Sequence, residues 1–114
     1  MHKIKRILPS LREKKHYIAF EVISEERLDK NMINDAIFDA NKSYLGELGC
    51  AKANFKVLDY NENSKKGMVK ANSKYIDYVK GSLALIKRIK NTKVIIKTIG
   101  VSGTIKSLKD KHAY

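Results

Sequence analysis

A short segment near the C-terminus has the residue types of an anion-binding loop. It covers residues 100–106 and reads GVSGTIK. Its two glycines permit unusual backbone dihedrals, and Ser102 or Thr104 can cap a following helix whose free N–H groups would attract a phosphate. Positive charge beside such a site would come from Lys106, Lys109 and Lys111. An ordinary strand-to-helix turn that uses glycine for its geometry explains the segment equally well.

No other residues form a recognisable catalytic or metal-binding set. The three histidines are scattered along the chain, without an adjacent carboxylate cluster. Asp29, Asp35 and Asp39 have the spacing of a solvated acidic stripe on one helix. Cys50 is the single cysteine, so it forms neither an internal disulfide nor a Cys-pair zinc site, and we expect a buried, inert thiol. We therefore expect no catalytic residue, no metal site and no cofactor bound by this chain.

The charge of the chain is large, positive and segregated. Lys and Arg number 24 against 12 Asp and Glu, a net charge of +12. Residues 1–16 carry a balance of +5, residues 17–64 of −4 and residues 65–114 of +11. Two basic ends around an acidic middle favour a face that meets a polyanion, nucleic acid rather than an anionic membrane.

The kind of cation also bears on what the chain binds. Twenty of the 24 basic residues are Lys. Lys is a point charge without a planar fork, which favours phosphate contact over the reading of base edges. Genome base composition explains the same bias equally well.

Length and composition predict one small folded domain. With 114 residues, 43% of them hydrophobic, and a single proline, the chain can bury one core without disulfide or metal staples. No apolar run exceeds four residues, far short of the roughly 18 that a membrane span needs. The N-terminus also lacks the apolar region of a secretory signal, so we expect a cytoplasmic protein.

Apolar periodicity predicts the first strand and the first helix. Residues 16–23 are rich in β-branched and aromatic side chains and apolar on nearly both faces, as in an interior strand. Ser24 would then cap a helix with two glutamates in its first turn. Apolar residues recur at helical spacing over residues 28–48, and Gly46 and Gly49 would end that helix.

Two strands and a second helix are expected next. Residues 51–57 and 67–72 alternate apolar and polar side chains, and the polar stretch 61–65 between them predicts a hairpin. Ser73 would cap a helix of about four turns. Its apolar stripe would consist of Ile76, Val79, Leu83, Ile86 and Ile89. A fourth strand at residues 94–99 would end at the following glycines.

The resulting order predicts an α+β fold of the ferredoxin-like or RRM-like βαββαβ class, a sandwich with a four-stranded antiparallel sheet. Two helices would cover one face of the sheet, and a short basic C-terminal helix containing Ile105 and Leu108 would follow. The other face would carry Lys52, Lys56, Lys70 and Lys97.

We expect a single domain overall, in three parts. A basic N-terminal arm would span residues 1–15 and the α/β sandwich residues 16–103. The basic C-terminal helix or tail would span residues 104–114.

Two motifs of this fold class are incomplete in the sequence. Residues 66–70, KGMVK, lack the aromatic side chains with which an RNA recognition motif stacks bases, so we expect a plain hairpin edge with Gly67 at a bulge or close approach. Acylphosphatases of this fold cradle phosphate with an arginine in a glycine-rich loop, and no arginine lies near Gly100 or Gly103. An autonomous small hydrolase is therefore poorly supported.

Three stretches of the chain together resemble archaeal ribonuclease P protein component 2. They are residues 8–22 (LPSLREKKHYIAFEV), 66–69 (KGMV) and 99–106 (IGVSGTIK). The likeness covers nearly the whole chain in length and order. Its most specific part is the combination of LREKK with GVSGTI.

The resemblance implies a protein subunit of ribonuclease P, the archaeal-type ribonucleoprotein endonuclease that removes the 5′ leader from precursor tRNA. The RNA subunit would perform the hydrolysis with Mg²⁺, and the protein would stabilise that RNA by neutralising phosphates. Implied partners are ribonuclease P RNA, precursor tRNA nearby, ribonuclease P protein component 3, as a pair or a heterotetramer, and the other ribonuclease P proteins. An rRNA-binding ribosomal or ribosome-assembly protein is the alternative that charge and fold also allow.

The expected RNA-binding residues come from the matched motifs and from the basic segments. The motifs contribute Arg12, Lys14, Lys15, Gly100, Ser102, Gly103, Thr104 and Lys106. The basic segments add Lys5, Arg6, Lys66, Lys70, Lys109 and Lys111. Lys106 stands where the family's final motif has arginine, which puts a bidentate phosphate contact there in doubt. For the face that meets component 3, the sequence offers only Phe38 and Leu45 as candidates, since they lie off the apolar stripes.

Overall fold

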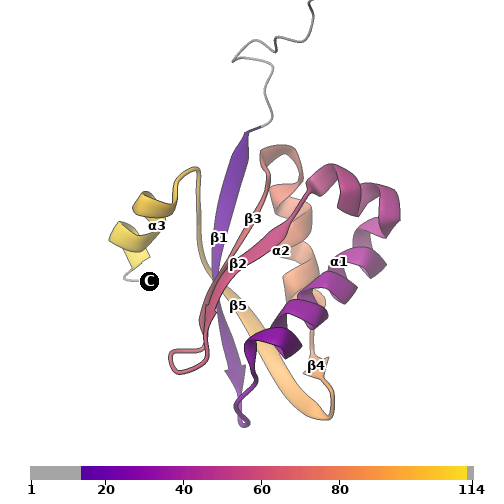
Figure 1. Ribbon diagram of the computed structural model, residues 1–114, viewed down its shortest axis with the longest axis vertical. Helices are drawn as coiled ribbons and strands as arrows, with labels where there is room; N and C mark the ends of the chain where they lie inside the picture. The colour runs from indigo at the N-terminus through magenta and orange to yellow at the C-terminus, as the bar shows by residue number, and fades with distance from the viewer. Residues whose placement is uncertain (1–13, 113–114) are drawn as a thin grey trace, which may run out of the picture.

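The computed structural model describes residues 14–112, with side chains as far as residue 109, as an antiparallel sheet with helices on both faces (Figure 1). The strand order across the sheet is β2-β3-β1-β5-β4. The elements are β1 (Lys15–Ser24), α1 (Lys30–Ala53), β2 (Lys56–Asn61), β3 (Lys66–Asn72), the 3-10 helix η3 (Ser73–Tyr75), α2 (Ile76–Leu85), β4 (Arg88–Ile89), β5 (Thr92–Ser102) and α3 (Ile105–His112).

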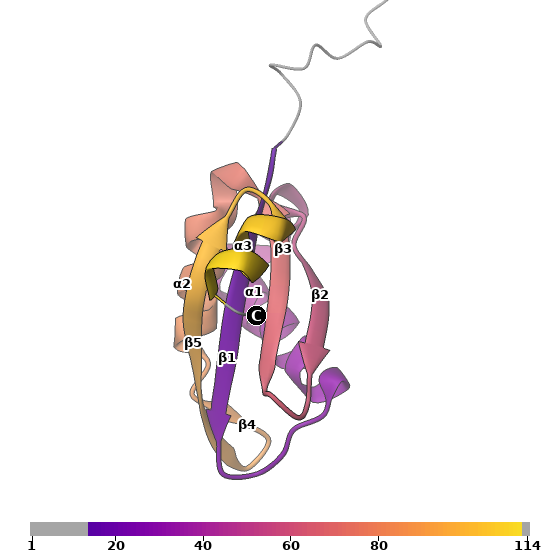
Figure 2. The same ribbon diagram turned by 90° about the vertical axis from the view of Figure 1, so that its left-hand side faces the viewer.

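The expected α+β class and RRM-like βαββαβ order are confirmed, with one strand more than predicted. α1 and α2 cover one face of the sheet, whereas α3 lies on the opposite face, as the two views at right angles show (Figures 1 and 2). The additional strand, β4, has only two residues and pairs with the start of β5 at the edge of the sheet.

The main core lies between β1 and the two long helices. Three alternate side chains of the central strand, Ile18, Phe20 and Val22, point toward α1 and α2 and are almost completely buried. Ile37 of α1 and Leu83 of α2 pack in the same core. Because such apolar side chains contribute about 1.5–3 kcal/mol each when fully buried, this layer supplies most of the stability of the sheet.

The predicted start of the first helix was wrong. Ser24 stays in β1, where it pairs with Val94, and its hydroxyl donates to the carbonyl of Glu26 at 2.6 Å. The helix begins at Lys30 because Asp29 caps it, accepting the backbone N–H of Met32 at 2.8 Å. The residues between Ser24 and Asp29 form a loop.

The predicted end of that helix was also wrong. Gly46 has φ 75° and ψ 174°, which breaks the helix locally, but the chain resumes helical geometry as far as Ala53. Asn54 then ends it in the left-handed conformation, donating its N–H to the carbonyl of Cys50 at 2.9 Å. Residues 51–53 are therefore helical, and β2 starts five residues later than the strand predicted from position 51.

The second predicted helix was too long, although all five residues of its predicted apolar stripe are buried in the core. Asn72, not Ser73, caps the short helix η3 that leads into α2. Ile86 has ψ 112°, so α2 ends at Leu85, and Ile89 lies in β4. Both isoleucines are nonetheless buried. The apolar residues spaced as in a helix therefore extend by chance past the end of α2 into β4, whose Ile89 faces the same core.

The last predicted strand was too short. β5 continues through Gly100 to Ser102, because these residues keep pairing with β1 after a register shift opposite Ala19 and Phe20. The hairpin between β2 and β3 and the C-terminal helix are confirmed. Among the described helices, none has the length and apolar content that crossing a membrane requires.

The close approach expected at Gly67 is confirmed and makes a stability prediction. A Cβ atom there would lie 2.5 Å from Cζ of Phe20 and 2.8 Å from the carbonyl oxygen of Asp59. Replacing Gly67 with Ala should therefore lower the free energy of unfolding by about 1–3 kcal/mol, because the buried ring and the neighbouring strand must shift. Chemical denaturation measures this loss.

Gly81 provides the matched control for this substitution. It is helical, and a Cβ atom there would meet nothing closer than Tyr44 at 3.6 Å. Gly81→Ala should therefore stabilise the protein by about 0.5–1 kcal/mol through lower backbone entropy of the unfolded chain. Equal effects of the two substitutions would contradict the packing described around Gly67.

Candidate nucleic-acid interface

Lysines gather on the sheet face that α1 and α2 leave uncovered. Val69 and Ala71 point into the main core, so Lys70 between them points to the opposite face. The cross-strand register places Lys56 of β2 directly beside Lys70. Two lysines directly opposite each other repel, which is a cost that a bound phosphate would relieve.

The residues at the start of β1 lie at the same end of the sheet. Tyr17 pairs with Lys70 on one side and with Ser102 on the other, which brings the beginning of β1 next to the ends of β3 and β5. The start of α3 follows immediately, and both views show it at this end (Figures 1 and 2). We call the resulting group the α3-end surface; its members are Lys14, Lys15, Lys56, Lys70 and Lys106.

Not every predicted RNA-binding residue joins this surface. Lys66 lies at the far end of β3, next to the β2–β3 turn. Lys109 is exposed on α3, and Lys111 is placed only as part of that helix. Lys5, Arg6 and Arg12 lie outside the described residues. On the uncovered face, the expected Lys56, Lys70 and Lys97 are confirmed, whereas Lys52 lies in α1 on the other side.

The helix α3 covers the centre of this face. Leu108 is 0% exposed and packs against Ala19 of β1 and Met68 of β3. Tyr17, Leu58 and Ile99 surround this second, smaller core. The free sheet surface expected from the RRM-like class is therefore reduced to its two ends. The apolar residues Leu58, Met68 and Leu108 were the feature of the sequence that could have indicated a helix over this face.

The segment 100–106 takes the form of a helix cap. Thr104 accepts the N–H of Ser107 on its hydroxyl at 3.1 Å, and its own N–H donates to the Ser102 hydroxyl at 3.3 Å. Gly100 and Gly103 do not use left-handed dihedrals. Among the described residues the N–H groups of Ile105 and Lys106 have no acceptor, so they remain for an anion.

His16 lies near Gly103, although nothing in the sequence indicated this contact. A Cβ atom on Gly103 would lie 3.9 Å from Nε2 of His16. Nδ1 of the same ring is buried without a hydrogen-bond partner among the described residues. Because His16 pairs with Ala71 of the main core, its ring lies on the sheet face that α1 and α2 cover, not among the lysines of the uncovered face.

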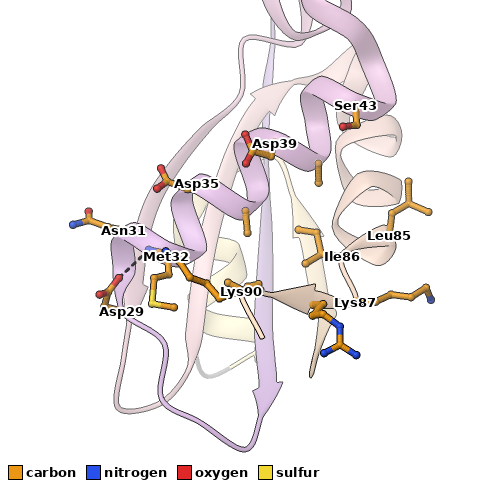
Figure 3. A pocket seen from close by; sticks show the side chains of 14 residues that line it. Asp29, Asn31, Met32, Asp35, Asp39, Ser43, Leu85, Ile86, Lys87 and Lys90 are labelled. Atoms are coloured by element: carbon orange, nitrogen blue, oxygen red, sulfur yellow. Dashed lines mark hydrogen bonds between the residues drawn. The ribbon is translucent and has the colours of Figure 1, made fainter. Parts of the chain in front are cut away.

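The acidic stripe faces a different part of the molecule. Asp35 and Asp39 are exposed on α1, and Asp29 is the cap of that helix. They line one side of a cleft of about 620 Å³, with Lys87 and Lys90 on the other side (Figure 3). Carboxylates on the rim would repel phosphate, and no group of metal ligands occurs among the described residues.

Two shifted pKa values have structural causes. Burial raises the pKa of the Cys50 thiol; Lys42 partly offsets this, and Glu47 adds to it. The thiol is half-buried, not buried as expected, and its raised pKa keeps it protonated at neutral pH. Burial likewise raises the pKa of Tyr60, whose ring stacks on Phe20 in the core. Neither group has a nucleophilic or general-base environment.

The fold and the cationic sheet end define a class, the small RRM-like α+β proteins with an extra helix on the open face. Structural comparison finds a chain of yeast ribonuclease MRP with a TM-score of 0.63 and 12% identity, which covers 82% of this chain and 76% of that chain. At this identity the likeness shows the fold.

Sequence comparison then gives the family. Residues 16–113 match the Rpp14/Pop5 family. Ribonuclease P protein component 2 of Pyrococcus furiosus is 45% identical over 94% of this chain and 89% of its own length. The Thermococcus kodakarensis protein of that name is 41% identical over 96% and 91%, and the Methanococcus vannielii one 36% over 97% and 84%.

The chain therefore belongs to the Rpp14/Pop5 family, and the resemblance to archaeal ribonuclease P protein component 2 is confirmed. The function expected from it is confirmed at the level of the assembly: the chain is a protein subunit of the ribonuclease P ribonucleoprotein, with RNA and other proteins.

The packing of α3 makes a second prediction. Leu108→Ala removes the only α3 side chain that the structure describes as fully buried, so α3 should detach before the rest of the fold opens. We expect a loss of about 2–4 kcal/mol in the local stability of α3, seen as faster amide exchange there than in α2. Ile105→Ala, at a position that is 38% exposed, is the control. Unchanged exchange in α3 after Leu108→Ala would show that the helix is held by other contacts.

Proposed function

We propose that this chain binds the catalytic RNA of ribonuclease P through phosphate contacts at the α3-end surface and stabilises its active fold. The RNA, with Mg²⁺, removes the 5′ leader from precursor tRNA, and the protein lowers the Mg²⁺ requirement by neutralising phosphates. The observation that carries this proposal is the cross-strand pair Lys56–Lys70 beside Lys14, Lys15 and Lys106 at one end of the sheet.

The division of labour within the chain follows from this proposal. The sandwich of residues 16–103 positions the contacts, while the basic arm 1–15 and the C-terminal helix 104–114 extend them along the RNA. Ribonuclease P protein component 3 is the proposed protein partner, as a pair or a heterotetramer, and the cytoplasm is the proposed location.

Reconstitution tests the function. Cleavage of precursor tRNA by the RNA subunit with component 3 should need less Mg²⁺ when this protein is added, because its lysines replace part of the ionic shielding. Activity against Mg²⁺ concentration is the measurement. An unchanged Mg²⁺ requirement would contradict the proposal, and purification of the tagged chain with rRNA in place of ribonuclease P RNA would favour a ribosomal role.

Substitution of the α3-end surface tests the contacts. Replacing the exposed Lys14, Lys56 and Lys106 with Ala should weaken binding to ribonuclease P RNA. It should also reduce the slope of log K against log salt by about 2–3, since each phosphate contact contributes roughly 0.7–0.9. Lys42, Lys52 and Lys80 are exposed on α1 and α2, and replacing them with Ala is the control. Equal slopes for the two triple variants would place the phosphates elsewhere.

A further inference from the structure

The β4–β5 hairpin and its flanks carry a second concentration of positive charge. Residues 87–97 contain five cations and no carboxylate, and all five side chains are exposed. No ion pair joins any of them to a carboxylate among the described residues, but Glu21 is the cross-strand partner of Lys97, and Asp29, Asp35 and Asp39 line the cleft that Lys87 and Lys90 share. A phosphate would therefore approach from the uncovered sheet face, where Arg88 and Lys93 lie. We call this group the hairpin surface; its members are Lys87, Arg88, Lys90, Lys93 and Lys97. None belongs to the expected RNA-binding residues, because the sequence pattern placed the first of them in a helix.

Two features of the hairpin work against its own stability. Arg88 lies directly opposite Lys93 in the β4–β5 pairing, and like charges in that position repel. Lys90 holds the turn with φ 56°, a left-handed conformation that costs a non-glycine residue about 1–2 kcal/mol. A bound polyanion would relieve the repulsion between Arg88 and Lys93.

An apolar strip lies beside these cations. Ile23 and Ile95 are cross-strand partners on the sheet face that carries α3, beyond the part that α3 covers, and they are 48% and 62% exposed. They line a cavity of about 900 Å³ together with Lys87, Arg88 and Lys93. Glu25 and Glu26 line it too, and their charge would keep phosphates on the hairpin side.

The hairpin surface is separate from the α3-end surface. β5 begins at the hairpin with Thr92 and ends beside α3 with Ser102, so its two ends lie about 30 Å apart at a rise of roughly 3.3 Å per residue. Lys97, in the middle of β5, lies about half that distance from Ser102. Figures 1 and 2 show β4 and the loop that leads from β5 into α3 at opposite ends of the sheet. A single phosphate contact therefore cannot serve both.

We propose that the hairpin surface binds a strand of the ribonuclease P RNA, with phosphates on its cations and the sugar and base edges on Ile23 and Ile95. This inference rests on the proposed function, and it adds a second RNA contact, so that the chain holds two segments of one RNA. Four of the five cations are Lys, which is depleted in protein–protein interfaces and suited to phosphate contact, so RNA is favoured over an acidic protein.

A neutral variant of the hairpin tests this contact. It combines Lys87→Gln, Arg88→Gln and Lys93→Gln with Lys90→Asn, since Asn tolerates left-handed dihedrals. The control replaces the exposed Lys42, Lys52, Lys74 and Lys80 with Gln. We expect the hairpin variant to lose backbone protection of one RNA segment in hydroxyl-radical footprinting, while the segments that depend on Lys14, Lys56 and Lys106 stay protected. The salt slope should fall by about 3.

Ile95→Ser is a milder second variant, because the side chain is largely exposed and its loss leaves the core intact. It should weaken RNA binding without changing the salt slope, since an apolar contact releases no counterions. The inference is overturned if both variants keep every protected segment, if they lose only binding to component 3, or if only added precursor tRNA loses protection. If the unmodified protein protects no segment of ribonuclease P RNA, the proposed function itself fails.

Discussion

The packing of β1 against its surroundings on both faces is the constraint on which the structure depends. Ile18, Phe20 and Val22 pack in the core with α1 and α2 on one face of this central strand, and Ala19 packs against Leu108 of α3 on the other face. β1 also pairs with β3 and with β5, so every cationic group described above is positioned through it. A strand whose second face carried polar, solvent-exposed side chains could not pack against helices on both sides.

This arrangement decides where charge can lie. With the helices on one face and α3 over the middle of the other, the exposed part of the sheet is reduced to two ends, and lysines of β2, β3 and β5 emerge there. Charge that looks evenly distributed along the C-terminal half of the sequence is thus divided between two surfaces. The repulsion at Lys56–Lys70 and at Arg88–Lys93 is the energetic cost of concentrating it.

The same features account for a subunit that contributes no catalytic group. Among the described residues, Asp29 caps a helix, Glu62 pairs with Arg27, and Asp35 and Asp39 are exposed. The Cys50 thiol is protonated, and the same residues contain no metal-ligand cluster. What the chain offers instead is rigidly placed positive charge. In a ribonucleoprotein, that serves the folding of RNA, whose phosphates otherwise depend on metal ions for neutralisation.

By itself the sequence determined the class of the fold, the central strand, the β2–β3 hairpin and the close approach at Gly67, because these depend on local residue patterns. It also determined the family, because the family motifs are contiguous in the chain. Tertiary structure alone decided the cap at Asp29, the break at Gly46 and the conversion of residues 88–89 into a strand. At each of these places two local patterns were compatible with the sequence, and pairing or packing with distant residues selected one. The two cationic surfaces belong to the same group, since their members come from separate strands and meet only through the register of the sheet.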